Sequence, residues 1–166
     1  DLDQTATIPF QAPGQTIILV GQRERRGWLG QSLYLRGILD REEGAPPPVD
    51  LHHERKTGDF VRSVIQCGHT RTVHYVSDGG LLAAVADMAM ASGIGAELTV
   101  DFGGPLHAAL FGEGQGRYVV VTDDGEPARA ILAMAAGAGV SARVIGRTGG
   151  LVIEPAANQA HPGGCR

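Results

Sequence analysis

Residues 75–82, YVSDGGLL, carry the first set of groups that could bind a ligand. A strand-like pattern ends there and a helical pattern begins, so Ser77 or Asp78 is placed to cap the helix. Gly79 and Gly80 would leave the N–H groups of the first turn open, and such groups at the positive end of a helix attract phosphate or sulfate. The same glycines are also typical of a helix that packs closely against a strand, and a double glycine does not decide between these interpretations.

A second set lies in residues 110–120, LFGEGQGRYVV. Its three glycines precede a strand instead of opening a helix, and no Gly-Lys-Ser or Gly-Lys-Thr is present, so neither a dinucleotide fingerprint nor a phosphate loop fits. Arg117 could give an anion a bidentate contact, whereas the carboxylates of Asp78 and Glu113 would repel it. A turn or bulge at the entry to a strand explains the glycines equally well. The candidate ligand-binding residues of both segments are Ser77, Asp78, Gly79, Gly80, Glu113, Gly114, Gln115 and Arg117.

No complete catalytic set and no metal site can be assembled from the sequence. No serine lies in a Gly-x-Ser-x-Gly elbow or has an identifiable histidine partner. Cys67, His69 and His74 lie close together in the sequence, but a structural zinc site needs a further paired cluster of ligands. We therefore expect no catalytic residue and no metal ligand, and we expect the purified chain not to hydrolyse ATP.

Composition and charge narrow the function classes. The chain has 166 residues, the length of one domain with a real core, and its formal net charge is -4 with Lys and Arg scattered along the sequence. We therefore expect no nucleic-acid partner. No apolar run approaches the ~18 residues of a membrane span, so no membrane partner is expected either. Cys67 and Cys165 form no spaced framework, which fits a reducing cytoplasm.

Hydrophobic periodicity predicts the elements that would position the two segments. Strands are expected at residues 16–20, 71–76, 95–102 and 117–122, with two short final strands within 141–155 joined at 148–150. Helices are expected at 29–39, at 51–66 behind an Asp50 cap, at 78–92 and at 126–138. The 78–92 helix carries adjacent apolar rows, so we expect Leu81, Val85 and Met88 to be buried.

These elements predict an α+β fold in which a mixed β-sheet has helices packed on one face. Residues 1–155 are expected to form a single domain. Residues 156–166 are polar and lack periodicity, which predicts a disordered tail.

Taken in order, the two glycine-bearing segments resemble a known family. HYVSDGGLLAAVADMAMASGIGAEL followed by ALFGEGQGRYVVV is similar to the last domain of the phosphoribosylformylglycinamidine synthase family, which has the fold of the aminoimidazole ribonucleotide synthetase C-terminal domain. FQAPGQTIILVG, LGQSLYL, PPPVDL and ARVIGRTGG match the same family in the same order, so the resemblance covers residues 10–154.

The resemblance implies an ATP- and Mg²⁺-dependent ligase that uses ammonia from glutamine to convert formylglycinamide ribonucleotide into its amidine. The family places ATP, the metal ions and the catalytic histidine mainly in upstream domains, so this domain would be structural and cleft-forming. Its partners would be those upstream domains and a glutaminase subunit or domain. One position departs from the family: Tyr75 stands where an Asp is usual, and a phenol does not replace a carboxylate as a Mg²⁺ ligand near neutral pH.

Two alternatives stay open at the level of the sequence. One is a free-standing regulatory domain of the same fold that binds an anion or a nucleotide and forms a homodimer when isolated. The other is an unrelated complete enzyme with a pocket that the sequence does not reveal.

Overall fold

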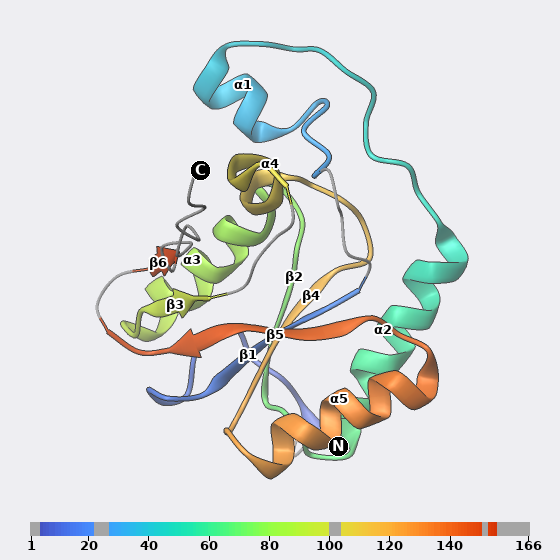
Figure 1. The fold of residues 1–166 in the computed structure, drawn as a ribbon, viewed down its shortest axis with the longest axis vertical. Helices are drawn as coiled ribbons and strands as arrows, with labels where there is room; N and C mark the ends of the chain where they lie inside the picture. The colour runs from blue at the N-terminus through green and yellow to red at the C-terminus, as the bar shows by residue number, and fades with distance from the viewer. Residues whose placement is uncertain (1–3, 22–26, 100–103, 151–152, 156–166) are drawn as a thin grey trace, which may run out of the picture.

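The computed structural model describes residues 4–21, 27–99, 104–150 and 153–155, arranged as Figure 1 shows. The elements in chain order are β1 (Thr16–Val20), α1 (Leu33–Leu39), α2 (Leu51–Gln66), β2 (Thr72–Tyr75), α3 (Gly80–Ser92), β3 (Ala96–Leu98), α4 (Leu106–Phe111), β4 (Tyr118–Thr122), α5 (Glu126–Ala138), β5 (Ala142–Thr148) and β6 (Ile153–Pro155). The expected tail at 156–166 lies outside the described residues.

The strands form one sheet in the order β2-β4-β1-β5-β3-β6. Neighbouring strands run antiparallel except β3 and β6, which are parallel, so the prediction of an α+β fold with a mixed sheet is confirmed. β5 and β6 follow one another in the sequence, but β3 lies between them in the sheet. The antiparallel pairing of β2 with β4 matters most for the site, because it brings the end of β2 beside the start of β4.

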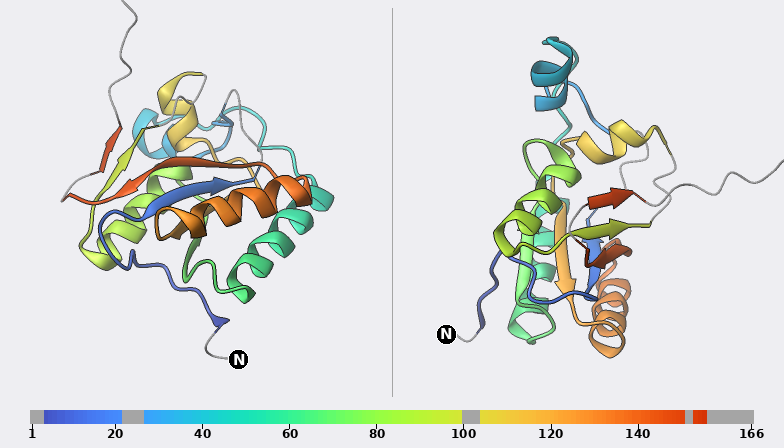
Figure 2. Two further views of the ribbon diagram at one scale, coloured as in Figure 1. Left: turned by 60° about the horizontal axis from the view of Figure 1, so that its bottom comes forward. Right: turned by 90° about the vertical axis from the view of Figure 1, so that its left-hand side faces the viewer.

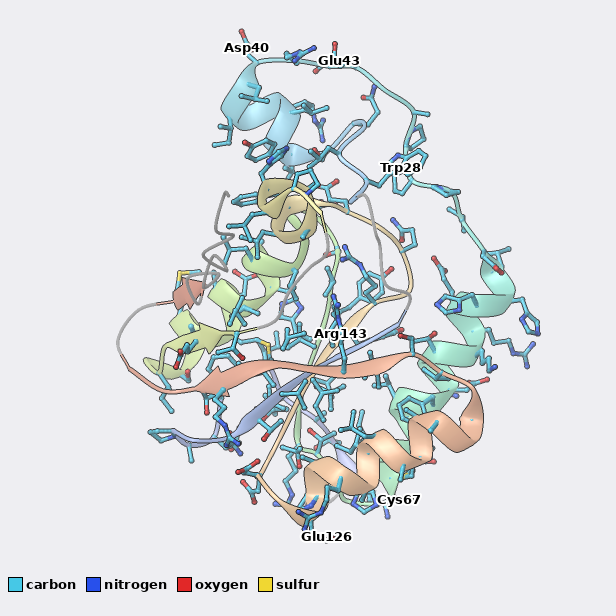
Figure 3. The ribbon with its side chains drawn as sticks, viewed as in Figure 1. Trp28, Asp40, Glu43, Cys67, Glu126 and Arg143 are labelled. Atoms are coloured by element: carbon cyan, nitrogen blue, oxygen red, sulfur yellow. The ribbon has the colours of Figure 1, made fainter. Side chains whose placement is uncertain are left out.

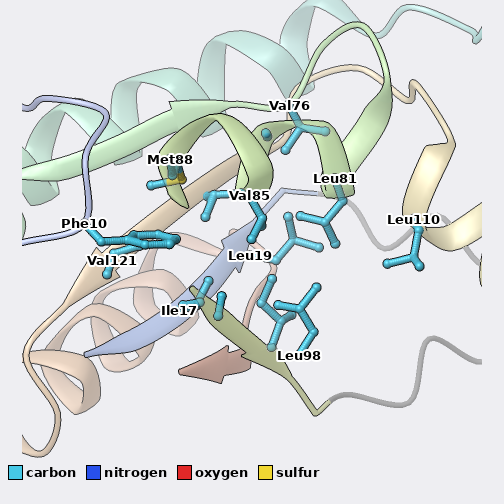
Figure 4. Packing of buried hydrophobic residues seen from close by; sticks show 14 residues of the cluster. Phe10, Ile17, Leu19, Val76, Leu81, Val85, Met88, Leu98, Leu110 and Val121 are labelled. Carbon is cyan, nitrogen blue, oxygen red and sulfur yellow. The ribbon is translucent and has the colours of Figure 1, made fainter. Parts of the chain in front are cut away.

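Side chains of the central strand β1 alternate between two separate hydrophobic cores. Ile17 and Leu19 pack with α3 and α4 on one face, as the close-up in Figure 4 shows, while Ile18 and Val20 pack with α2 and α5 on the other. Helices therefore lie on both sides of the strands (Figure 2), and the prediction of helices on one face is wrong in this respect. The physical reason is that all five β1 residues are buried, so each face of the strand needs its own cover.

The N-terminal caps of two helices were predicted from the sequence, one correctly and one wrongly. α2 begins as predicted, because the carboxylate of Asp50 accepts a hydrogen bond from the backbone N–H of His53 at 3.0 Å. α3 has Gly79 at its N-cap position with φ 77° and no side-chain cap bond, so the expected cap by Ser77 or Asp78 is wrong. The burial of its apolar row is confirmed, since Leu81, Val85 and Met88 are fully buried.

The six-residue helix α4 was not predicted, because it is too short to show a clear helical period. Within the part of the chain that the structure describes, no helix has both the length and the apolar character needed to cross a membrane.

Candidate functional site

The two glycine-bearing segments meet at one end of the sheet. Tyr75 at the end of β2 pairs with Tyr118 at the start of β4, and the N–H of Val76 donates to the carbonyl oxygen of Arg117 at 2.9 Å. Residues 77–80, which follow β2, therefore lie beside residues 113–117, which precede β4. The structure therefore brings the two sets of candidate residues into direct contact.

Glu113 links these segments through its carboxylate. Its Oε1 accepts hydrogen bonds from the backbone N–H of Gly79 and from that of Leu33, each at 2.8 Å. Its own backbone N–H donates to the carbonyl oxygen of Trp28 at 2.9 Å. The N–H of Gly79, at the N-cap of α3, is thus bonded to a carboxylate of the same chain.

Gly80 is required by close packing of the backbone. Its φ is 74°, and a Cβ atom built on it would lie 2.7 Å from the carbonyl carbon of Phe111 and 2.8 Å from the carbonyl oxygen of Gly112. Side chains larger than hydrogen would therefore collide with the end of α4 and meet a strained backbone conformation as well. The packing interpretation of this glycine thus has direct support in the geometry.

Arg117 lies inside the glycine-rich loop. The side chain is buried, with 3% of its surface exposed. Its Nε donates to the carbonyl oxygen of Gly114 at 3.1 Å, and its Nη2 donates to that of Gly112. The guanidinium thus uses its fork geometry to hold two loop carbonyls, and it is not presented to solvent in this conformation.

Tyr75 and Gln115 form the outer part of the contact. The Tyr75 hydroxyl donates to Oε1 of Gln115 at 3.0 Å, and the N–H of Gly116 donates to the same hydroxyl at 3.4 Å. The Tyr75 ring packs edge-on against Tyr118, with the centroids 5.1 Å apart. Burial raises the pKa of the Tyr118 phenol, and the neighbouring Tyr75 and Glu54 raise it further, so Tyr118 stays protonated near neutral pH.

Ser77 and Asp78 lie at the exposed rim of this region. The carbonyl oxygen of Ser77 accepts a hydrogen bond from the N–H of Gly80 at 3.0 Å, which closes the turn into α3. Sequence reasoning missed Trp28 and Leu33, which reach Glu113 from about eighty positions upstream in the chain. Leu33 lies in the segment LGQSLYL that resembles the family, but nothing in the sequence pairs Leu33 or Trp28 with Glu113.

The donor set of the region does not fit a metal ion. Among the residues that the structure describes, no three or more His, Cys, Asp or Glu side chains are grouped so that they could hold one. His74, one of the sequence candidates, instead has Nδ1 2.6 Å from the carbonyl oxygen of Tyr75 and Nε2 3.6 Å from a carboxylate oxygen of Asp87.

A small polar pocket of about 280 Å³ lies at the opposite end of β2 and β4. Its lining polar groups largely bond to one another: Thr122 donates to the carbonyl oxygen of His69 at 2.6 Å, and Gln15 donates to Asp123 at 3.0 Å. These groups give an incoming ligand little that is not already paired.

Comparison with known proteins places the chain in a family. The family model "AIR synthase related protein, C-terminal domain" matches residues 12–151. The phosphoribosylformylglycinamidine synthase subunit PurL of Methylocella silvestris is 49% identical over 153 residues, and that of a Bradyrhizobium species is 52% identical over 154 residues. Each match covers 92% of this chain but 20% of the relative, so the chain spans about a fifth of the length of the curated relatives that it matches.

Solved structures agree in fold. Thermotoga maritima PurL complexed with FGAR has a TM-score of 0.75 and 20% identity, with 89% of this chain and 26% of that chain covered. Escherichia coli HypE has a TM-score of 0.63 and 18% identity, with 95% of this chain and 51% of that chain covered. The family model, the mixed sheet and these superpositions lead to the same conclusion: the chain belongs to the family of the AIR synthase related protein, C-terminal domain.

Proposed function

We propose that this chain is the C-terminal domain of a phosphoribosylformylglycinamidine synthase. That ligase converts formylglycinamide ribonucleotide to formylglycinamidine ribonucleotide with ATP, Mg²⁺ and ammonia from glutamine. The observation that carries the proposal is the identity of 49% and 52% with two PurL subunits across 92% of this chain. Regions of this length necessarily include both glycine-bearing segments and the elements that join them.

Within the enzyme, the role of this domain is structural and cleft-forming. The groups that would bind a phosphate are engaged internally: Gly79 and Leu33 donate to Glu113, and Arg117 donates to loop carbonyls. ATP and Mg²⁺ then belong to other domains of the parent enzyme. The partners of this domain would be those other domains and a glutaminase subunit or domain. The enzyme would act in the cytoplasm.

A second candidate function is that of a free-standing regulatory domain that binds an anion or a nucleotide. The exposed residues at the start of α3 favour it. Ser77 and Asp78 are exposed beside the half-buried Gly79, so a strong anion that displaced Glu113 would gain the N–H of Gly79. The proposed ligand site of this alternative consists of Ser77, Asp78, Gly79, Gly80, Glu113, Gly114, Gln115 and Arg117. Titration with phosphate while backbone amide shifts are followed by NMR tests it. Shifts that spare Gly79, Gly80 and Gly114 would reject the site.

The main proposal is tested by growth. In a bacterial strain that lacks the ligase and needs added purine, a hybrid gene encodes the Bradyrhizobium PurL with its matched region replaced by this chain. We expect growth without purine, because a domain of the same enzyme should restore the cleft. Soluble hybrid protein that fails to support growth would count against the proposal, and a hybrid that carries the HypE region instead serves as the control for fold alone.

A further inference from the structure

The loop between β1 and α2 carries a helix whose apolar face is only half covered. We call residues 28–45 the α1 loop. Figure 1 shows α1 at the edge of the molecule, beyond α4 and away from the sheet. Tyr34 and Leu35 in its first turn contact the body: the Tyr34 ring stacks on Phe111 with centroids 4.9 Å apart, and Leu35 is buried.

The same face continues into the second turn without cover. Ile38 lies four positions after Tyr34, and Leu39 lies four positions after Leu35, so both pairs share a side of the helix. Yet Ile38 is 71% exposed and Leu39 is 44% exposed. An apolar helix face that extends beyond the part packed on its own domain is typical of a surface that another element covers.

The α1 loop is held in place at its base. The indole Nε1 of Trp28 donates to the carbonyl oxygen of Ala45 at 2.6 Å. The backbone N–H of Gln31 donates to the carbonyl oxygen of Glu43 at 3.1 Å, and its side-chain Nε2 donates to the carbonyl oxygen of Gly44 at 3.0 Å. Glu113 adds the bond to Leu33 from the body. These contacts fix the position of the exposed apolar turn relative to the domain.

Two residues with left-handed backbone conformations flank the same helix. Among the described residues, the non-glycine positions with positive φ are Gln31 at 60° and Asp40 at 49°, and they stand on either side of α1. Such conformations are unfavourable for residues with a Cβ atom and persist where the surrounding structure imposes them. Asp40 is the C-cap residue of α1, and its N–H donates to the carbonyl oxygen of Leu35, so the helix ends directly after the exposed Ile38 and Leu39.

We propose that the second turn of α1, with Ile38 and Leu39 at its centre, is a docking surface for the other domains of the parent polypeptide. This inference rests on the proposed function. The relatives are about five times as long as the region that this chain matches, so most of such a polypeptide remains to be packed against this domain. Exposed Arg36, Asp40 and Glu43 give the apolar centre a polar rim, which is the usual anatomy of such a contact.

The test compares one introduced thiol in two settings. Ile38→Cys, with Cys165→Ser, is placed in the 166-residue chain and in the full-length hybrid described above. Native Cys67 serves as the internal reference, since it is exposed and lies at the far end of the molecule from the α1 loop (Figure 3). Alkylation by iodoacetamide is measured for each peptide by mass spectrometry, and product formation by the hybrid is measured in parallel.

We expect the labelling rate at position 38, relative to Cys67, to be about tenfold or more lower in the hybrid than in the isolated chain, as for a site that reacts only after local opening. An unchanged ratio in a hybrid that forms product would overturn the docking surface and leave the proposed function standing. Protection in a hybrid that forms no product would support the surface and count against the proposed function. Protection in the isolated chain that rises with its concentration, together with a dimer in sedimentation, would assign the surface to a second copy and overturn the proposal.

Discussion

Gly79 and Glu113 are joined by a 2.8 Å hydrogen bond from the backbone N–H of Gly79 to Oε1 of the Glu113 carboxylate. The same oxygen accepts from Leu33 at the start of α1, so one side chain connects α1, α3 and the glycine-rich loop. A carboxylate held near a helix N-terminus is stabilised by the helix dipole. At the start of α3, the N–H of Gly79 therefore bonds to Glu113 and the N–H of Gly80 bonds to the carbonyl oxygen of Ser77.

Glu113→Ala should lower the free energy of unfolding by about 1–3 kcal/mol, because it leaves two N–H groups without their acceptor. Glu113→Gln keeps an acceptor oxygen and should cost less. Urea unfolding followed by circular dichroism measures both. Glu126→Ala is the matched control: its carboxylate bonds only to the exposed Arg129 side chain among the contacts described, and surface pairs contribute about 0–1 kcal/mol. Equal losses for Glu113→Ala and Glu126→Ala would contradict the linking role of Glu113.

Two glycine substitutions should change the free energy of unfolding in opposite directions. Gly80→Ala should destabilise the fold by more than about 1 kcal/mol, since the new Cβ meets backbone atoms of α4 at a positive φ. Gly137→Ala lies within α5 with no atom within 4 Å of the new Cβ, so it should stabilise by roughly 0.5–1 kcal/mol. Thermal unfolding of the two variants checks this pair. A harmless Gly80→Ala would reject the packing explanation for that glycine.

Local sequence patterns predicted the helices and strands well, but they did not predict the contacts between residues that lie far apart in the sequence. Asp50 and the apolar row of Leu81, Val85 and Met88 could be identified because capping and helical periodicity act over a few residues. The partner of Gly79 could not be identified, because it arrives from position 113 through the pairing of β2 with β4. The second layer of helices was missed for a similar reason: a fully apolar strand does not say which helices cover its faces.

Val85→Asp should prevent stable folding, with a loss of at least about 4 kcal/mol, because an unpaired charge would enter a fully buried site between α3 and the sheet. Met90→Asp on the same helix replaces a side chain that is 75% exposed and should leave the melting temperature nearly unchanged. Circular dichroism and analytical gel filtration separate the two results. A folded Val85→Asp variant as stable as the wild type would rule out the packing of α3 described here.

Acid should weaken one identifiable contact. Hydrogen bonds from Arg147 and then from Thr16 hold the pKa of Asp124 at about 2, below its ordinary value of 3.8. Since the folded pKa is the lower one, the carboxylate contributes its full stabilisation above about pH 4, and that contribution is lost as the pH falls through about 2. The difference in melting temperature between wild type and Asp124→Asn should therefore shrink from pH 4 to pH 2. The exposed Asp78→Asn serves as the control, and a difference for Asp124→Asn that is constant over this range would contradict the ion pair.

The central claim is that this chain serves as one domain of the amidine-forming ligase. Its most direct test is the rate at which the purified hybrid PurL, supplied with ATP, Mg²⁺, ammonia and formylglycinamide ribonucleotide, forms the amidine. We expect a rate within about tenfold of the parent enzyme, equivalent to roughly 1.4 kcal/mol in the barrier, while the isolated chain hydrolyses no ATP. A folded hybrid with no detectable amidine, or ATP hydrolysis by the isolated chain that a point mutation within it abolishes, would contradict this account.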